Sequence, residues 1–234
     1  MDIGHSTLQL VEGMEKYNLW IFGKFSKYIK GKILEIGCGM GTITQFYVND
    51  FDVTASDISE KYLRIVRQRF RNCKNFHPVI FDIESKTSIL YENNFDTIIS
   101  SNVLEHIRND TDALSNMNKI LKKDGILILL VPACRLLFSN LDRNLGHYRR
   151  YLKPEIKNKL ENAGFTVEKQ FYVNIVGAFG WFFSGKILKR KTIEYSSLSL
   201  FNFFVPLFIF IERIFKFSFG LSIISICKKQ NKKS

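Results

Sequence analysis

The sequence of 234 residues predicts an α/β fold built on a mostly parallel sheet with helices on both faces. A turn with three alternating glycines, residues 35–41, joins an apolar run at 32–36 to a segment at 42–48 that we expect to be helical. Further apolar runs of strand length alternate with helix-like segments, and several of them end in polar residues. The expected strands cover 32–36, 51–56, 76–81, 95–100, 125–131, 165–173 and 221–227.

Helix signals separate these strands. Ser59 is a predicted N-cap for a helix that turns apolar residues inward at helical spacing. Asp110 or Thr111 caps the next helix, and Gly125 is expected to end it. Pro154 suits the first turn of a further helix before the strand at 165–173.

The glycine turn is the most informative feature for function. Glycine is required where the backbone takes positive φ or approaches a ligand closely, and a helix N-terminus there can face a nucleotide-like cofactor. A dinucleotide fingerprint has its third glycine one position later, where this chain has Thr42. Glu35, two places before the first glycine, would repel a pyrophosphate but attract a cation. A dehydrogenase is therefore the weakest alternative.

Polar residues at the strand ends extend this expected ligand site. Asp57 ends the second strand about 20 residues after the glycine turn, where an acid can hold both ribose hydroxyls. Asp82 and Ile83 follow the third strand, and Ser101 and Asn102 follow the fourth. Taken singly, the acids could be ordinary turn residues, and their joint pattern favours a cofactor.

The motifs EIGCGMG at 35–41 and FDTIISSNVLEHI at 95–107, with GILILLVP at 125–132, resemble those of class I S-adenosylmethionine-dependent methyltransferases. The type 11/type 12 group of small-molecule enzymes is the most similar. The resemblance implies a Rossmann-like, seven-stranded sheet with an antiparallel last strand, and S-adenosylmethionine as cofactor. Glu35 would orient its amino group, Asp57 its ribose, and Asp82 and Ile83 its adenine. The expected cofactor residues are Glu35, Gly37, Cys38, Gly39, Gly41, Asp57, Ile58, Asp82, Ile83, Ser101 and Asn102.

The composition bounds the remaining choices. A net charge of +12 favours anionic partners and permits an RNA or DNA methyltransferase. The fourth strand nevertheless lacks the Asp/Asn-Pro-Pro-aromatic signature of amine methylation, so we expect no nucleic-acid substrate. The 4 cysteines are scattered, which indicates a reducing compartment, and no secretory signal is visible. We therefore expect a cytoplasmic protein.

Residues 136–151 form a polar loop after the fifth strand, and the resembling group carries a similar Gly-His-Tyr-Arg-Arg-Tyr stretch. His147, or His106 after the fourth strand, is the candidate base for a hydroxyl acceptor. Tyr148 and Arg149 are candidate substrate contacts, and a structural clasp between Arg149 and an acid such as Asp142 is the alternative. Tyr17, in an expected helical lid over residues 1–31, is a third substrate candidate. The spacing around Glu105–His106 offers no further ligand, so we expect no metal.

We expect one domain over 1–234, with a cofactor core at 32–173, a helical insertion at 174–220, and a last strand with a basic tail at 221–234. The insertion holds half of the 22 phenylalanines. Its apolar run at 203–211 is shorter than the ~20 residues of a spanning helix, which argues against a membrane span. A cap on protein is the first interpretation, and peripheral contact with anionic lipid is the second.

The sequence therefore predicts a methyltransferase acting on a small, saccharide-linked or lipid-linked acceptor, at a hydroxyl. The alternatives are an RNA or DNA methyltransferase and a non-catalytic adaptor that keeps the fold. The oligomeric state is left open.

Overall fold

In the computed structural model, which describes residues 3–85, 95–192, 194–215 and 217–230, seven strands form one sheet in the order β3-β2-β1-β4-β5-β7-β6. β7 pairs antiparallel with both β5 and β6, and the other pairs are parallel. The predicted seven-stranded sheet with an antiparallel last strand is confirmed. The strands are β1 Ile33–Ile36, β2 Val53–Asp57, β3 Phe76–Ile80, β4 Phe95–Ser101, β5 Leu121–Pro132, β6 Phe165–Val173 and β7 Ser222–Lys229.

Successive residues of the buried strands point to opposite faces, and each face packs against its own helices. Leu34 belongs to the apolar cluster that contains α4 and α6 residues, whereas Ile33 belongs to the cluster that contains α2 and α3 residues. The α-helices are α1 Ile3–Glu12, α2 Glu15–Gly23, α3 Glu60–Arg69, α4 Asp110–Ile120, α5 Asn140–Leu145, α6 Lys153–Asn162, α7 Ile175–Phe182 and α8 Tyr195–Ile214.

Two predicted helices differ from those observed. The segment at 42–48 contains a single 3₁₀ turn, η2 (Thr44–Phe46), because three β-branched residues at 42–44 disfavour a helix directly after the glycines. α4 is capped by Asn109, whose side chain accepts from the Asp112 amide, and it ends at Ile120 because β5 begins at Leu121. The predicted cap at 110 or 111 and the predicted end at Gly125 are therefore wrong.

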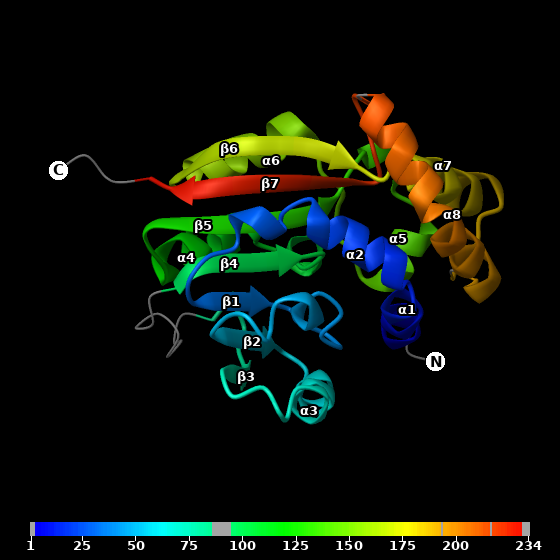
Figure 1. The fold of residues 1–234 in the computed structure, drawn as a ribbon. Coiled ribbons are helices and arrows are strands. Elements are labelled where there is room, and N and C mark those ends of the chain that lie inside the picture. Colours follow the sequence, from blue (N-terminus) through cyan, green and yellow to red (C-terminus); the bar gives the residue numbers. More distant parts are fainter. Residues whose placement is uncertain (1–2, 86–94, 193, 216, 231–234) are drawn as a thin grey trace.

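The carboxyl ends of the parallel strands face a group of helices from three parts of the chain. Figure 1 shows α1, α5, α7 and α8 gathered at the end of the sheet to which the arrowheads of β1, β2, β4 and β5 point. α7 continues into a π-helical segment, η6 (Phe183–Ile187), and α8 packs against α2. The insertion at 174–220 thus reaches the edge where a ligand binds in such sheets.

α8 corrects the length argument against a membrane helix. It spans 20 residues, more than the apolar run at 203–211, because it starts in an uncharged stretch at Tyr195 and continues through Pro206. Within the described residues, it is the one helix whose length and hydropathy would allow it to cross a membrane. Sequence length therefore does not exclude a span. The last part of the basic tail, residues 231–234, lies outside the described residues.

Candidate functional site

The three glycines after β1 adopt positive φ for different reasons. φ is +72° at Gly37, +51° at Gly39 and +78° at Gly41. A Cβ on Gly37 would lie 2.3 Å from Val103 Cγ2, and one on Gly41 would lie 2.6 Å from the Phe70 ring. A Cβ on Gly39 would meet nothing closer than Leu8, at 3.8 Å. Gly37 and Gly41 therefore permit close packing, and Gly39 leaves its backbone open to a ligand beneath α1.

Glu35 is a buried acid at the end of β1 and directly below this turn. Its Oε2 accepts hydrogen bonds from Thr44 Oγ1 at 2.5 Å and from Tyr47 Oη at 2.6 Å. Burial raises the pKa of Glu35 to about 7 despite these two bonds. A carboxyl group of this kind gains stability as an anion when an ammonium group approaches it.

Asp57 connects the glycine turn to α3. Its Oδ2 accepts from the Gly39 amide and its Oδ1 from the Ser59 amide, each at 2.9 Å. Burial raises the pKa of Asp57 above its ordinary value. Each carboxylate oxygen keeps a second lone pair for a ribose hydroxyl. The next side chain, Ile58, is 75% exposed beside it and offers an apolar surface to a ring.

The remaining predicted cofactor residues lie along the same edge with unequal access. Asp82 is exposed, and its Oδ1 accepts from the Glu84 amide. The Ile83 side chain is buried in the core, so any contact with adenine would go through its backbone. Asn102 is exposed with φ of +53°, directly after the half-buried Ser101. Cys38 is buried, and burial raises the pKa of its thiol, which leaves its backbone as the ligand-facing part.

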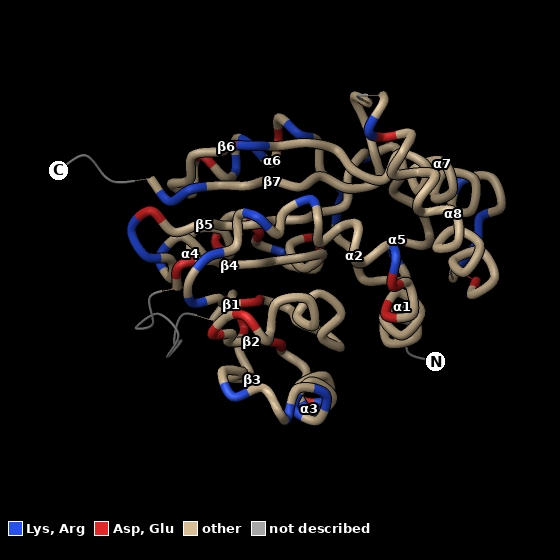
Figure 2. The backbone as a smooth tube through the Cα atoms, in the orientation of Figure 1, with Lys and Arg blue, Asp and Glu red and all other residues tan. Residues whose placement is uncertain are grey.

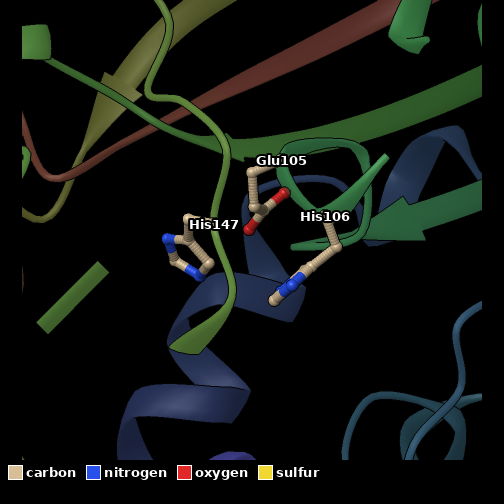
Figure 3. A group of neighbouring side chains, drawn as sticks. All are labelled: Glu105, His106 and His147. Carbon is tan, nitrogen blue, oxygen red and sulfur yellow. The ribbon is translucent and has the colours of Figure 1, made fainter. Parts of the chain in front are cut away.

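His106 and His147, the predicted catalytic residues, lie together although they are far apart in the sequence (Figure 3). Their rings meet edge to face with centroids 4.8 Å apart. His106 belongs to the turn η4 (Leu104–His106) after β4, and His147 follows α5. Desolvation and the neighbouring His147 lower the pKa of His106 to about 4, so its ring is neutral at physiological pH.

Glu105 completes a group that the sequence spacing did not reveal. One ligand atom from each of Glu105, His106 and His147 lies within 4.8 Å of the other two. Glu105 is fully buried, and neither of its carboxyl oxygens has a hydrogen-bond partner among the described residues. Burial raises the pKa of this carboxyl group to about 8.

Asp142, considered in the sequence only as a clasp, is the buried centre of the loop. Its Oδ1 accepts from His147 Nδ1 at 3.1 Å and from Arg150 Nε at 2.7 Å. Its Oδ2 accepts from the Ser139 amide at 2.9 Å and from Trp181 Nε1 at 3.2 Å. These partners lower the pKa of Asp142 although it is buried. The Ser-x-x-Asp capping pattern at 139–142 was the available sequence signal.

The arginine contacts differ from the predicted clasp by one position. Arg150, not Arg149, pairs with Asp142, and its guanidinium also stacks over the Trp181 ring at 4.7 Å. Arg149 pairs with Asp110 at 2.9 Å, because the two arginines point to opposite sides of the loop. Tyr148 remains 51% exposed. Of the predicted substrate residues in this loop, Tyr148 is the more accessible.

Tyr17, the third predicted substrate residue, lines a cavity of about 200 Å³ between the leading helices and the insertion. Leu141 of α5, Trp181 of α7 and Phe201 of α8 also line it, and most of its surface is apolar. Burial raises the pKa of Tyr17 to about 12, and the Asn174 side chain hydrogen-bonds to it. Trp181, which forms part of the cavity wall, also donates a hydrogen bond to Asp142, the residue that binds His147.

The sheet order, the glycine turn and the two buried acids are those of the class I S-adenosylmethionine-dependent methyltransferase fold. The site fits that cofactor on two observations: the open backbone at Gly39, and the buried Glu35, which suits the ammonium group. Asp57 and Ile58 would hold the ribose side. When bound, S-adenosylmethionine supplies an electrophilic methyl group on a sulfonium.

Comparisons with known proteins agree with this class. Residues 34–127 match the family model described as a methyltransferase domain. A non-reducing polyketide synthase of Penicillium brasilianum is 33% identical over 118 residues, which are 47% of this chain but 5% of that protein. A Bacillus halodurans protein described as a methyltransferase has the same fold, with a TM-score of 0.63 at 18% identity over 90% of this chain and 99% of that one. The carbon methyltransferase CurJ has a TM-score of 0.57 at 18% identity over 86% of this chain and 49% of its own.

Proposed function

We propose that this chain is an S-adenosylmethionine-dependent methyltransferase that acts on a lipid-linked acceptor, at a hydroxyl, while resting on an anionic membrane surface. The observation that carries the proposal is the largely apolar cavity between α2, α7 and α8. Trp181 lines this cavity and donates a hydrogen bond to Asp142. An apolar anchor in this cavity would contact Trp181, whose partner Asp142 also binds His147. His106 and His147 remain the candidate groups at the reacting end.

The outer face of α8 supports membrane contact. Five large apolar side chains, spaced three or four residues apart, are each at least half exposed along one stripe: Leu200, Phe203, Leu207, Phe210 and Ile214. The opposite stripe holds the helix on the domain, since Val205 is buried, Asn202 accepts from the Tyr17 amide and Glu212 pairs with Lys24. This anchoring favours a helix lying in the interface over one that crosses the membrane.

The exposed apolar surface is wider than this one stripe. Phe179, Phe182 and Phe183 on α7 and η6 are also exposed. The apolar surface is therefore wider than the narrow stripe by which two helices pair. Figure 2 shows the tube of α7 and α8 as mostly uncharged. Residues 174–220 contain six basic and two acidic residues, and both acids, Glu194 and Glu212, are paired. The charge therefore complements an anionic lipid surface.

Vesicle flotation tests this proposal. The chain should float with vesicles of phosphatidylcholine and phosphatidylglycerol, and less with phosphatidylcholine alone. The double variant Phe203→Ser/Phe210→Ser should lose most of this binding, whereas Ile80→Ser, which changes an equally exposed residue on β3 at the far side of the sheet, should retain it. Equal flotation of all three proteins, or dimerisation that disappears in the double variant, would contradict the lipid surface.

A second candidate is methylation at carbon. It is favoured by the polyketide synthase relatives and by the carbon methyltransferase CurJ. The family model ends at residue 127, however, before the loop at 136–151 and the insertion that line the acceptor side. Mass spectrometry and NMR of the product of a β-dicarbonyl acceptor and of a lipid-linked alcohol would decide between the two, since O-methyl and C-methyl carbons differ in chemical shift.

A further inference from the structure

We propose that Glu105, His106 and His147 bind one divalent transition-metal ion of the zinc type beside the acceptor site. The binding stands on the geometry alone, and any role of the ion in catalysis rests on the proposed function.

The carboxyl group of Glu105 is the strongest reason. A buried polar group without a partner is costly, and buried acids are normally paired or coordinated to a cation. Both Glu105 oxygens lack a hydrogen-bond partner among the described residues, while the two imidazoles of the group lie beside them (Figure 3). Arg150 is near enough to act electrostatically on Glu105, but its hydrogen bonds go to Asp142 and to the backbone.

The histidines are prepared as ligands. His147 has its Nδ1 on Asp142, which leaves Nε2 for an ion. A carboxylate behind a ligating histidine is the usual outer-shell arrangement, because it fixes the ring and its tautomer. His106 is hydrogen-bonded to the backbone of Gly146, which leaves its other nitrogen available.

The donor set selects the ion. Two imidazoles and one carboxylate suit zinc or iron, whereas magnesium and calcium prefer oxygen ligands. Zinc bonds of about 2.0–2.2 Å place tetrahedral ligands about 3.4 Å apart. The three atoms lie within 4.8 Å of one another, so binding requires them to approach by up to about 1.4 Å. Three protein ligands leave a fourth position, where a Lewis acid lowers the pKa of a bound hydroxyl group.

Titration of the chelator-treated protein with Zn²⁺ tests the site, and the Co²⁺ absorption spectrum reports the ligands. We expect one ion per chain and a tetrahedral Co²⁺ spectrum without thiolate charge-transfer bands. Glu105→Gln and His147→Gln should each weaken Zn²⁺ binding at least about 100-fold. The loss of a residue that only supports a ligand typically weakens metal binding about 10-fold to 100-fold, so a loss this large indicates a direct ligand. His77→Gln, which removes an exposed histidine on β3, should leave binding within about twofold.

Several results would overturn the site: no saturable binding by the wild-type chain, unchanged affinity in Glu105→Gln, or a thiolate band in the Co²⁺ spectrum. Glu105→Gln keeps the size of the side chain. For both variants, circular dichroism and S-adenosylmethionine affinity check folding independently of metal. If methyl transfer proceeds equally with and without metal, the catalytic role fails while the proposed function stands. If no acceptor is methylated in either state, the proposed function fails while the titration still decides the site.

Discussion

Replacing each of two glycines in the turn by alanine should separate packing from cofactor binding. Gly37→Ala places a Cβ 2.3 Å from Val103 Cγ2, more than 1 Å inside an ordinary carbon contact of about 3.5–4.0 Å. Overpacking of this kind costs about 1–3 kcal/mol, and a non-glycine residue at positive φ costs about 1–2 kcal/mol more. Gly37→Ala should therefore lower the free energy of unfolding by about 2–5 kcal/mol.

Gly39→Ala carries only the cost of positive φ, about 1–2 kcal/mol, because its Cβ would meet nothing closer than 3.8 Å. That Cβ occupies the open side of the turn, so it should weaken S-adenosylmethionine binding at least about 10-fold, or about 1.4 kcal/mol. Urea denaturation and isothermal titration measure the two quantities. Wild-type cofactor affinity in Gly39→Ala, or a larger loss of stability there than in Gly37→Ala, would refute the assignment of roles.

Three further predictions concern the buried acids and the cavity. Because burial raises the pKa of Glu35 to about 7, the cofactor-free chain binds an extra proton when folded and should lose up to about 3 kcal/mol of stability between about pH 5 and pH 8. Glu35→Gln should reduce that decline in urea denaturation, and an unchanged decline would contradict it. Asp142→Asn leaves Arg150 buried without its anion and should cost about 3–5 kcal/mol in the same assay, with a near-neutral result excluding the ion pair as a stabilising contact. Trp181→Phe should raise KM for the acceptor while S-adenosylmethionine affinity stays unchanged, and a matched loss of both would place Trp181 on the cofactor side.

The strand ends and the positive-φ glycines of the first turn were predictable because their determinants are local. The glycines, Glu35 and Asp57 fall within 23 positions, and their order along the chain mirrors their place on adjacent strands. The error here was the helix at 42–48, where the β-branched run at 42–44 outweighed the general expectation of a helix after the glycine turn.

The contacts of the loop at 136–151 were only partly predictable because they join distant segments. The bond from Trp181 to Asp142 links residues 39 apart, and no periodicity in either segment indicates it. The predicted clasp named Arg149 where the structure has Arg150 for a similar reason. Adjacent residues of an extended loop point to opposite sides, and the sequence does not say which side is buried. His147 was identified as a candidate, but its position against Glu105 and His106 depends on how the loop after α5 crosses the end of β4.

The buried carboxylate of Asp142 connects the insertion at 174–220 to the loop at 136–151, two segments that are separate in the sequence. Asp142 holds Trp181 of the insertion through Oδ2 and His147 through Oδ1. A shift of α7 on the domain would therefore change the hydrogen bond that supports His147, the imidazole proposed to lie at the reacting end. If α7 and α8 respond to a lipid surface, that response reaches His147 through a single side chain. Under the proposed function, vesicles that bind the aromatic face should change the kcat of the wild-type chain more than that of Trp181→Phe, which keeps the ring but lacks the Nε1–H donor. An equal change of kcat in the wild-type chain and in Trp181→Phe would show that the Trp181–Asp142 hydrogen bond does not transmit the effect of the lipid surface to His147.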